Sequence, residues 1–157
     1  MGEILYLADR ACLRHPPNRR PDRARPRQRI LLAYSGKAER EYLAVFLASR
    51  GYDVIACANG KEALAHLAGS HFDLVVTGIV MQHVDGLELV SALRRRSGPP
   101  VIAMADGGGR MDGIYVRMAG LSGAVATHIF PEAGGALLKS VDWILRGRDE
   151  VIRDVVW

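Results

Sequence analysis

The chain has 157 residues, 49% of them hydrophobic and only 6% aromatic, and a formal net charge of +4 at pH 7. This length indicates one domain with short extensions, and the composition supplies an aliphatic core. No apolar run approaches the roughly 20 residues of a membrane span, and no cleavage site follows the short apolar start, so we expect a cytoplasmic protein. Cys12 and Cys57 lack metal or redox spacing and are interpreted as reduced thiols.

Residues 1–28 are interpreted as a basic N-terminal arm. From Arg10 to Arg29 the chain holds eight arginines, four prolines and one acidic residue, whereas residues 30–157 hold thirteen basic and fourteen acidic residues. The prolines forbid a continuous helix and favour a flexible, solvated chain. Such an arm can bind phosphate backbones, acidic protein surfaces or anionic lipid. A disordered leader without a role explains it equally well, and we expect no membrane partner.

From Arg29 onward, short apolar runs alternate with amphipathic stretches, which is typical of βα repeats around a parallel sheet. Right-handed crossovers then predict a doubly wound α/β domain over residues 29–147, with helices on both faces of the sheet. The tail at 148–157 is rich in apolar side chains and is expected to dock on the domain. The expected strands are 30–34, 52–56, 73–77, 101–104 and 124–127, and the expected helices are 38–50, 60–68, 87–96, 113–119 and 136–145.

Functional side chains of such a fold lie where parallel strands end, at one edge of the sheet. In this chain that edge carries no obvious nucleophile with an adjacent base. The expected positions are Tyr34 and Ser35 after the first strand, Gly78 after the third, Ala105 and Asp106 after the fourth, and Thr127 and His128 after the fifth.

Three motifs have spacings that a generic α/β core does not require. They are F-D-L-V-V-T-G-I-V-M-Q-H-V-D-G-L-E-L at 72–89, G-Y-D-V-I-A-C-A-N-G-K-E-A-L at 51–64 and P-P-V-I-A-M at 99–104. Together they resemble bacterial response-regulator receiver domains of the chemotaxis-receiver type. The resemblance covers the chain from Arg29 to Arg146 and implies a flavodoxin-like five-stranded fold.

The same resemblance implies that the phosphorylation chemistry has been lost. The acidic pair that holds Mg²⁺ falls on Tyr34 and Ser35, and the phospho-accepting aspartate falls on Gly78. The hydroxyl that contacts the phosphoryl group falls on Ala105, the lysine that pairs with phosphate on Thr127, and the aromatic switch on Ala124. Hard cations need charged oxygen ligands, and phosphoryl transfer needs both metal and nucleophile. We therefore interpret the chain as a pseudo-receiver with no cofactor, no metal and no enzymatic activity.

Other chemistry at this edge has weak support. Asp106 is interpreted as a solvated loop carboxylate, and His83 and His128 as solvated histidines rather than metal ligands. The three glycines at 107–109 form a mobile loop in this interpretation, although backbone N–H groups in such loops sometimes hold anions.

Receivers pass signals through their fourth helix, fifth strand and fifth helix, which implies a protein-binding face here. Aromatic residues and arginine often anchor such faces. Trp143 fits core packing equally well, and Ile114 and Ile144 favour the core. The candidate residues are Ile114, Tyr115, Arg117, Ala124, Trp143 and Arg146.

Three functions remain open on the sequence. The first is a module of two-component (phosphorelay) signalling that binds a kinase, a regulator or a second copy of itself without phosphorylation. The second is a nucleic-acid-associated protein that uses the basic arm on a dimeric receiver fold. The third is a small-molecule sensor with a ligand in the vacated pocket under Tyr34, Gly78 and Thr127.

Overall fold

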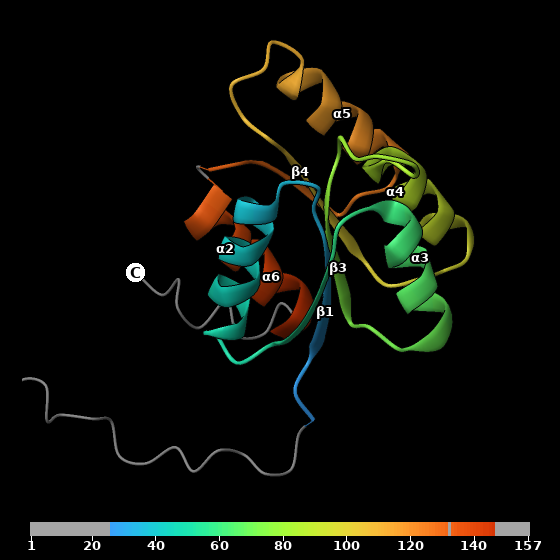
Figure 1. The fold of residues 1–157 in the computed structure, drawn as a ribbon, viewed down its shortest axis with the longest axis vertical. Helices are drawn as coiled ribbons and strands as arrows, with labels where there is room; N and C mark the ends of the chain where they lie inside the picture. Colours follow the sequence, from blue (N-terminus) through green and yellow to red (C-terminus); the bar gives the residue numbers. More distant parts are fainter. Residues whose placement is uncertain (1–25, 132, 147–157) are drawn as a thin grey trace, which may run out of the picture.

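In a computed structural model, residues 26–131 and 133–146 are described, and they form alternating strands and helices (Figure 1). The expected flavodoxin-like architecture is confirmed, with most boundaries within one or two residues of the prediction. None of the described helices is long and apolar enough to cross a membrane. The elements are β1 (Arg29–Ala33), α2 (Lys37–Ala48), β2 (Asp53–Cys57), α3 (Gly60–Gly69), β3 (Leu74–Gly78), α4 (Gly86–Arg95), β4 (Val101–Ala105), α5 (Asp112–Ser122), β5 (Ala126–Ile129) and α6 (Ala133–Arg146).

All five strands are parallel and lie in the order β2-β1-β3-β4-β5. The strands β3 and β4 are buried at every position, and β1 is buried at all but its first. Near-continuous runs of Leu, Val and Ile suit such central strands, because helices cover both of their faces. The carboxyl ends of β1, β3 and β4 therefore meet at one edge of the sheet, as the alternating pattern predicts.

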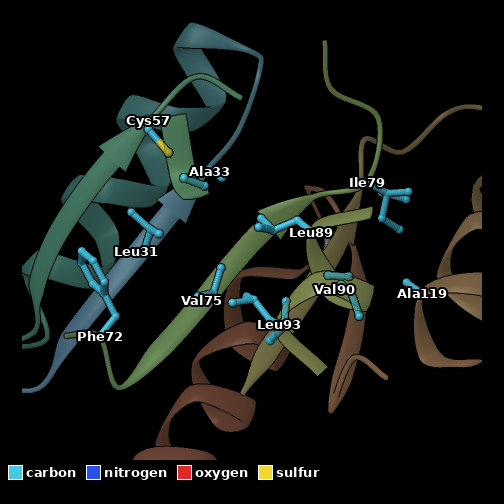
Figure 2. Packing of buried hydrophobic residues seen from close by; sticks show 14 residues of the cluster. Leu31, Ala33, Cys57, Phe72, Val75, Ile79, Leu89, Val90, Leu93 and Ala119 are labelled. Atoms are coloured by element: carbon cyan, nitrogen blue, oxygen red, sulfur yellow. The ribbon is translucent and has the colours of Figure 1, made fainter. Parts of the chain in front are cut away.

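Two hydrophobic clusters hold the helices on the sheet. One cluster joins alternate residues of β1, β3 and β4 to α3, α4 and α5, and Figure 2 shows Leu31, Val75 and Leu89 within it. The other joins the opposite-facing residues of the same strands to α2 and α6, with Leu43 and Leu137 as fully buried contributors. The period-2 alternation of a strand divides its side chains between the two faces, so α2 and α6 cover one face and α3, α4 and α5 the other (Figure 1).

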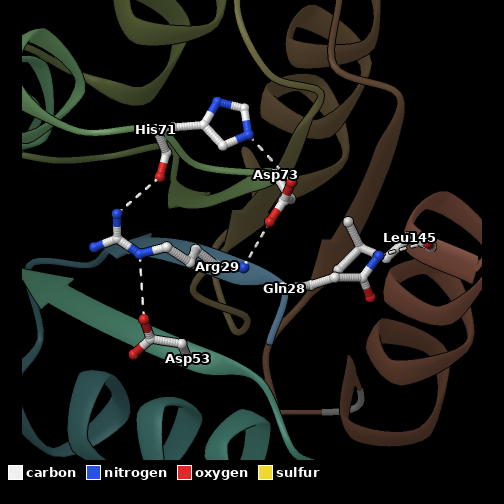
Figure 3. A network of polar contacts seen from close by, with 6 residues as sticks. All are labelled: Gln28, Arg29, Asp53, His71, Asp73 and Leu145. Atoms are coloured by element: carbon white, nitrogen blue, oxygen red, sulfur yellow. Dashed lines mark hydrogen bonds and ion pairs between the residues drawn. The ribbon is translucent and has the colours of Figure 1, made fainter. Parts of the chain in front are cut away.

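A polar network ties the amino-terminal edge of the sheet together (Figure 3). The backbone N–H of Arg29 donates to Asp73 at 2.7 Å, and its guanidinium donates to Asp53 at 3.2 Å and to the His71 carbonyl at 3.0 Å. Gln28 Nε2 donates to the carbonyl of Leu145 at 2.7 Å. Arg29, the last of the eight arginines counted from Arg10, is therefore held within the folded domain.

The fifth strand lies two residues later than the sequence analysis predicts. Residues 124–127 were expected, but the chain at Gly123 has φ +118°, and the N–H of Ala124 donates to the carbonyl of Ala119. Both features belong to the end of α5, which continues through Gly120 to Ser122 rather than stopping at Ala119. Glycine is a weak stop signal inside a helix and a strong one in the left-handed conformation, which explains the error.

Candidate functional site: a filled pocket at the carboxyl edge of the sheet

Tyr34 fills the space next to Gly78 at the end of β3. The Tyr34 side chain is only 1% exposed. A Cβ placed on Gly78 would lie 3.2 and 3.3 Å from Cδ2 and Cε2 of the Tyr34 ring. These separations are tighter than ordinary van der Waals contact, so the ring and a larger side chain at position 78 compete for one volume. The pocket that the third hypothesis assigned to a ligand is occupied by this ring.

The hydroxyl of Tyr34 fixes the loop after β4. Tyr34 Oη donates a hydrogen bond of 2.6 Å to Asp106 Oδ1. Burial raises the pKa of this phenol far above its usual value, and the hydrogen bond to Asp106 and nearby carboxylates act in the same direction. Asp106 is exposed on its loop, as the sequence analysis predicts, and one of its carboxylate oxygens also accepts from this buried phenol.

The glycine loop after Asp106 is held at both ends. Gly107 has φ +77°, and a Cβ there would collide with the carbonyl oxygen of Phe130, so only glycine fits. At the other end the N–H of Gly109 donates to Asp112 Oδ2 at 2.7 Å. A carboxylate already accepts from this N–H, which argues against an anion site at 107–109.

Arg40 of α2 clamps the chain that follows β1. Its Nη1 donates to the carbonyl oxygens of Tyr34 at 2.6 Å and Ser35 at 3.1 Å. Ser35 Oγ in turn donates to the carbonyl of Val80, at 3.3 Å. These contacts explain how the backbone holds the Tyr34 ring over Gly78.

Thr127 lies inside β5, where its Cα is in register with that of Ala103. The expectation that it follows the fifth strand is wrong, because this strand begins later than predicted. The residue beside Tyr34 at the end of β5 is Phe130, with the two ring centroids 6.3 Å apart. The backbone N–H of Phe130 donates to the carbonyl of Ala105, which is buried and is the last residue of β4. The structure thus brings together Tyr34, Gly78, Ala105, Asp106 and Phe130.

These residues do not fit a magnesium ion. The end of β1 offers a buried phenol and a serine rather than two carboxylates, and Asp106 already accepts from Tyr34. Within the described parts of the chain, no group of three His, Cys, Asp or Glu side chains is placed to hold a metal. His128 instead contacts Ser140 of α6, with Nε2 and Oγ 2.9 Å apart, and burial lowers its pKa.

The predicted protein-binding face is only partly exposed. Ile114 is 49% exposed rather than in the core, and Trp143 is 43% exposed. Tyr115 and Ala124 pack against the core formed with α3 and α4. Ile144 is half-buried against the α2 and α6 side, as expected. The chain places Arg117 and Arg146 at exposed positions of α5 and α6.

The sequence analysis missed an apolar stripe on the same face. Four exposed apolar side chains recur at helical spacing along α5 and at its N-cap residue. Two more lie in or next to β5, which is an edge strand of the sheet. The spacing of three and four residues between the helical members indicates a single helix face, and this pattern can be read from the sequence. The stripe comprises Met111, Ile114, Met118, Leu121, Val125 and Ile129.

Comparison with known proteins agrees with this fold. The chain is 35% identical over 89 residues to the transcriptional activator protein PfeR of Pseudomonas aeruginosa, which covers 57% of this chain and 29% of PfeR. It is 30% identical over 125 residues to the probable transcriptional regulator ycf27 of Porphyra purpurea, covering 80% of this chain and 50% of that protein. The chain therefore spans about half of these relatives' length or less.

Among solved structures, the receiver domain of the Francisella response regulator 1452 superposes with a TM-score of 0.68 at 22% identity, over 76% of this chain and 97% of that one. At this identity the likeness concerns the fold alone. The family profile of the response regulator receiver domain matches residues 30–133, from β1 to the start of α6. This chain therefore belongs to the response regulator receiver domain family, the receiver modules of two-component signalling.

Proposed function

We propose that this chain is a pseudo-receiver that signals through protein contacts without being phosphorylated. The packing of the Tyr34 ring against Gly78 carries the proposal, since it occupies the volume into which an acceptor carboxylate would project. The positions that the family resemblance assigns to metal ligands hold Tyr34 and Ser35. No catalytic residue is assigned.

Phe130 strengthens the proposal at the end of β5. A phosphoryl group at this edge needs cationic neighbours, because its charge would otherwise be buried unpaired. The side chain beside Tyr34 is instead a phenyl ring in aromatic contact. An apolar ring and a buried phenol make this edge unsuited to a bound phosphoryl group. The same filling gives the small-molecule alternative no support.

In this proposal, the hydrogen bond between Tyr34 and Asp106 links the end of β1 to the loop before α5. The 2.6 Å bond and the glycine loop hold that loop in one arrangement. The start of α5 follows six residues after Asp106, so α5 and its apolar stripe are positioned without metal or phosphate. The stripe is then available at all times to a kinase, a regulator or a second copy of the chain.

Incubation of the full chain with acetyl phosphate and Mg²⁺ tests the loss of phosphorylation. We expect the intact mass to remain unchanged, while a receiver domain that retains its acceptor aspartate gains a phosphoryl group in the same mixture. A stable adduct on this chain, mapped to one carboxylate by peptide mass spectrometry, would overturn the proposal.

A second candidate, binding of nucleic acid, is favoured by the eight arginines between Arg10 and Arg29. The relatives PfeR and ycf27 are described as a transcriptional activator and a probable transcriptional regulator, which makes a role near DNA compatible with this family. The arm lies largely outside the described residues, so its charge alone supports this candidate.

Fluorescence anisotropy with a labelled DNA duplex tests the second candidate. Contacts to several phosphates predict that affinity falls by roughly 10³-fold or more between 50 and 200 mM salt. Replacing Arg19, Arg20 and Arg23 with glutamine in the full chain is expected to weaken binding and flatten the salt dependence. Equal affinities of the two chains at both salt concentrations would exclude the arm as a nucleic-acid contact.

A further inference from the structure

The outer surface of α2 carries an apolar groove that the pseudo-receiver proposal does not use. It has a volume of about 620 Å³ and is lined by Ala38, Glu41, Tyr42, Val45, Phe46 and Ser49. Tyr42 is 54% and Val45 70% exposed, although both are apolar or aromatic. An exposed cluster of this kind on one helix face indicates a surface that something covers.

The floor of the groove is held in place by aromatic contacts. The rings of Tyr42 and Phe46 are stacked with an interplanar angle of 9° and centroids 6.1 Å apart. Phe130 meets Tyr42 edge-on, with centroids also 6.1 Å apart, and the Arg50 guanidinium lies 5.8 Å from the Phe46 centroid. These contacts fix the aromatic rings before any occupant arrives, which lowers the entropic cost of docking.

The last described residues of α6 lie close to this end of α2. Tyr52, four residues after α2, donates to Asp142 of α6 at 2.6 Å, and Arg146 lies 3.5 Å from the same carboxylate. Gln28 donates to the Leu145 carbonyl (Figure 3). The carboxyl end of α6 therefore lies near the starts of β1 and β2. Among the residues that line the groove, Phe46 and Ser49 are nearest to Tyr52 in sequence.

We propose that residues 147–157 dock in this groove on α2. Five of these eleven residues are apolar, namely Val151, Ile152, Val155, Val156 and Trp157. The six residues from Gly147 to Ile152 span up to roughly 20 Å when extended, whereas the twelve residues of α2 extend about 18 Å. A segment of this length therefore matches the length of the helix that carries the groove.

The tethered segment is favoured over a separate partner by effective concentration. A short covalent link to α6 gives a docking segment an effective concentration on the order of millimolar, which a second copy does not match at ordinary protein concentrations. The other exposed apolar surface, on α5 and β5, lies against the opposite cluster of helices. The contacts of Leu145 and Asp142 place the end of α6 beside Gln28 and Tyr52, on the face of the sheet that α2 covers.

A thermodynamic cycle in the full chain tests the docking. Val45→Lys and Ile152→Lys are each expected to lower the Tm by about 3 °C, and the double variant by little more than either single variant, because both changes break one contact. Val80→Lys, at a residue that is 54% exposed and lies outside both the groove and the stripe, is the matched control and should combine additively with Ile152→Lys. Additive losses for Val45→Lys with Ile152→Lys, or no loss from Ile152→Lys, would overturn the proposal.

Disulfide trapping distinguishes the occupants. In a Cys12→Ser background, oxidation of the Val45→Cys/Ile152→Cys chain is expected to form a crosslink within one chain, mapped by peptide mass spectrometry. The Val80→Cys/Ile152→Cys chain, with its first cysteine outside both the groove and the stripe, should form none. A crosslink between two chains would assign the groove to a second copy instead, and no crosslink at all would exclude the docked segment.

Discussion

The structural roles of Tyr34 and Gly78 depend on each other. A tyrosine at the end of β1 needs an empty volume for its ring, and the glycine at the end of β3 supplies it. The phenol then needs an acceptor, because a buried hydroxyl without one destabilises the fold, and Asp106 is that acceptor. The three residues come from three strand ends that are distant in sequence.

Tyr34→Phe tests this interaction through its pH dependence. The folded-state pKa of Tyr34 is raised above the ordinary value of 10.0, so its contribution to stability is complete below pH 10 and is lost as the pH rises above it. We expect the variant to be about 1 kcal/mol less stable at pH 7 and to lose less of its free energy of unfolding between pH 9 and 11.

Urea unfolding at a series of pH values measures this change. Tyr52, with a pKa raised to about 12, and Cys57, with a pKa raised to about 11, act in the same direction, so the variant should retain part of the alkaline slope. Tyr52→Phe is the matched control, since it removes a similar hydroxyl from a different site. An unchanged alkaline slope in Tyr34→Phe would contradict the buried hydrogen bond.

The lowered pKa of His128 predicts that stability falls at acid pH, whereas the raised pKa of Tyr34 predicts a fall at alkaline pH. Burial lowers the folded-state pKa of His128 below 6.5, so the unfolded chain binds the proton more readily and stability falls as the pH drops below 6.5. His128→Gln is expected to reduce this fall between pH 6.5 and 5. Thermal unfolding across that range measures it, with His66→Gln on an exposed face of α3 as the comparison. If the stability of His128→Gln falls as steeply between pH 6.5 and 5 as that of the wild type, His128 is not the source of the fall.

At the scale of elements, the start of α4 is set by a close approach to β3. A Cβ on Gly86 would collide with the carbonyl oxygen of Gly78 and lie 2.7 Å from the Ile79 Cα. The N–H of Gly86 donates to the Ile79 carbonyl at 2.8 Å, and Asp85 caps the helix through the Glu88 N–H. Residue 86 must therefore be glycine for α4 to lie against the end of β3.

Gly86→Ala should therefore destabilise the domain by about 1–3 kcal/mol, the usual cost of overpacking. Gly120→Ala is its control in α5, where an added Cβ meets nothing within 4 Å. Because alanine favours a helix interior over glycine, this second change should stabilise by roughly 0.5–1 kcal/mol. Urea denaturation of both variants distinguishes steric collision from helix propensity, and equal effects of the two changes would contradict the close approach.

Boundaries of elements were predicted best where the local signal was strong. The buried strands β1, β3 and β4 follow from their aliphatic runs, and Asn59 and Asp85 cap α3 and α4 through the N–H groups of Glu62 and Glu88. The prediction was wrong at β5, because Gly120 and Gly123 look alike in sequence and only Gly123 adopts the left-handed conformation. That error also put Thr127 rather than Phe130 at the candidate site.

At the scale of the whole molecule, the apolar stripe on α5 and β5 is the binding face that our proposal assigns to a pseudo-receiver. We expect Ile114→Glu/Met118→Glu to weaken self-association or binding to a kinase or regulator by at least tenfold, because charges at an apolar contact are desolvated unpaired. Both side chains are substantially exposed, so the Tm should change little. Sedimentation velocity over a concentration series measures self-association.

Val80→Glu is the control for this prediction, since it changes an exposed apolar residue outside the stripe. It is expected to leave association unchanged. If the wild-type chain and both variants have the same association behaviour with themselves and with the tested partner, the stripe is not the binding face.

The sequence by itself determined the βα order, the burial of the central strands and the residue types at the strand ends, because periodicity and local propensity are properties of neighbouring residues. It was enough to identify the family and, through the family resemblance, to predict that a glycine stands at the acceptor position. Only the tertiary structure decided that Tyr34 fills the space over Gly78, that Asp106 accepts its hydrogen bond and that Phe130 lies beside it. These contacts join strand ends more than 20 residues apart, and the register that brings them together depends on packing across the whole sheet.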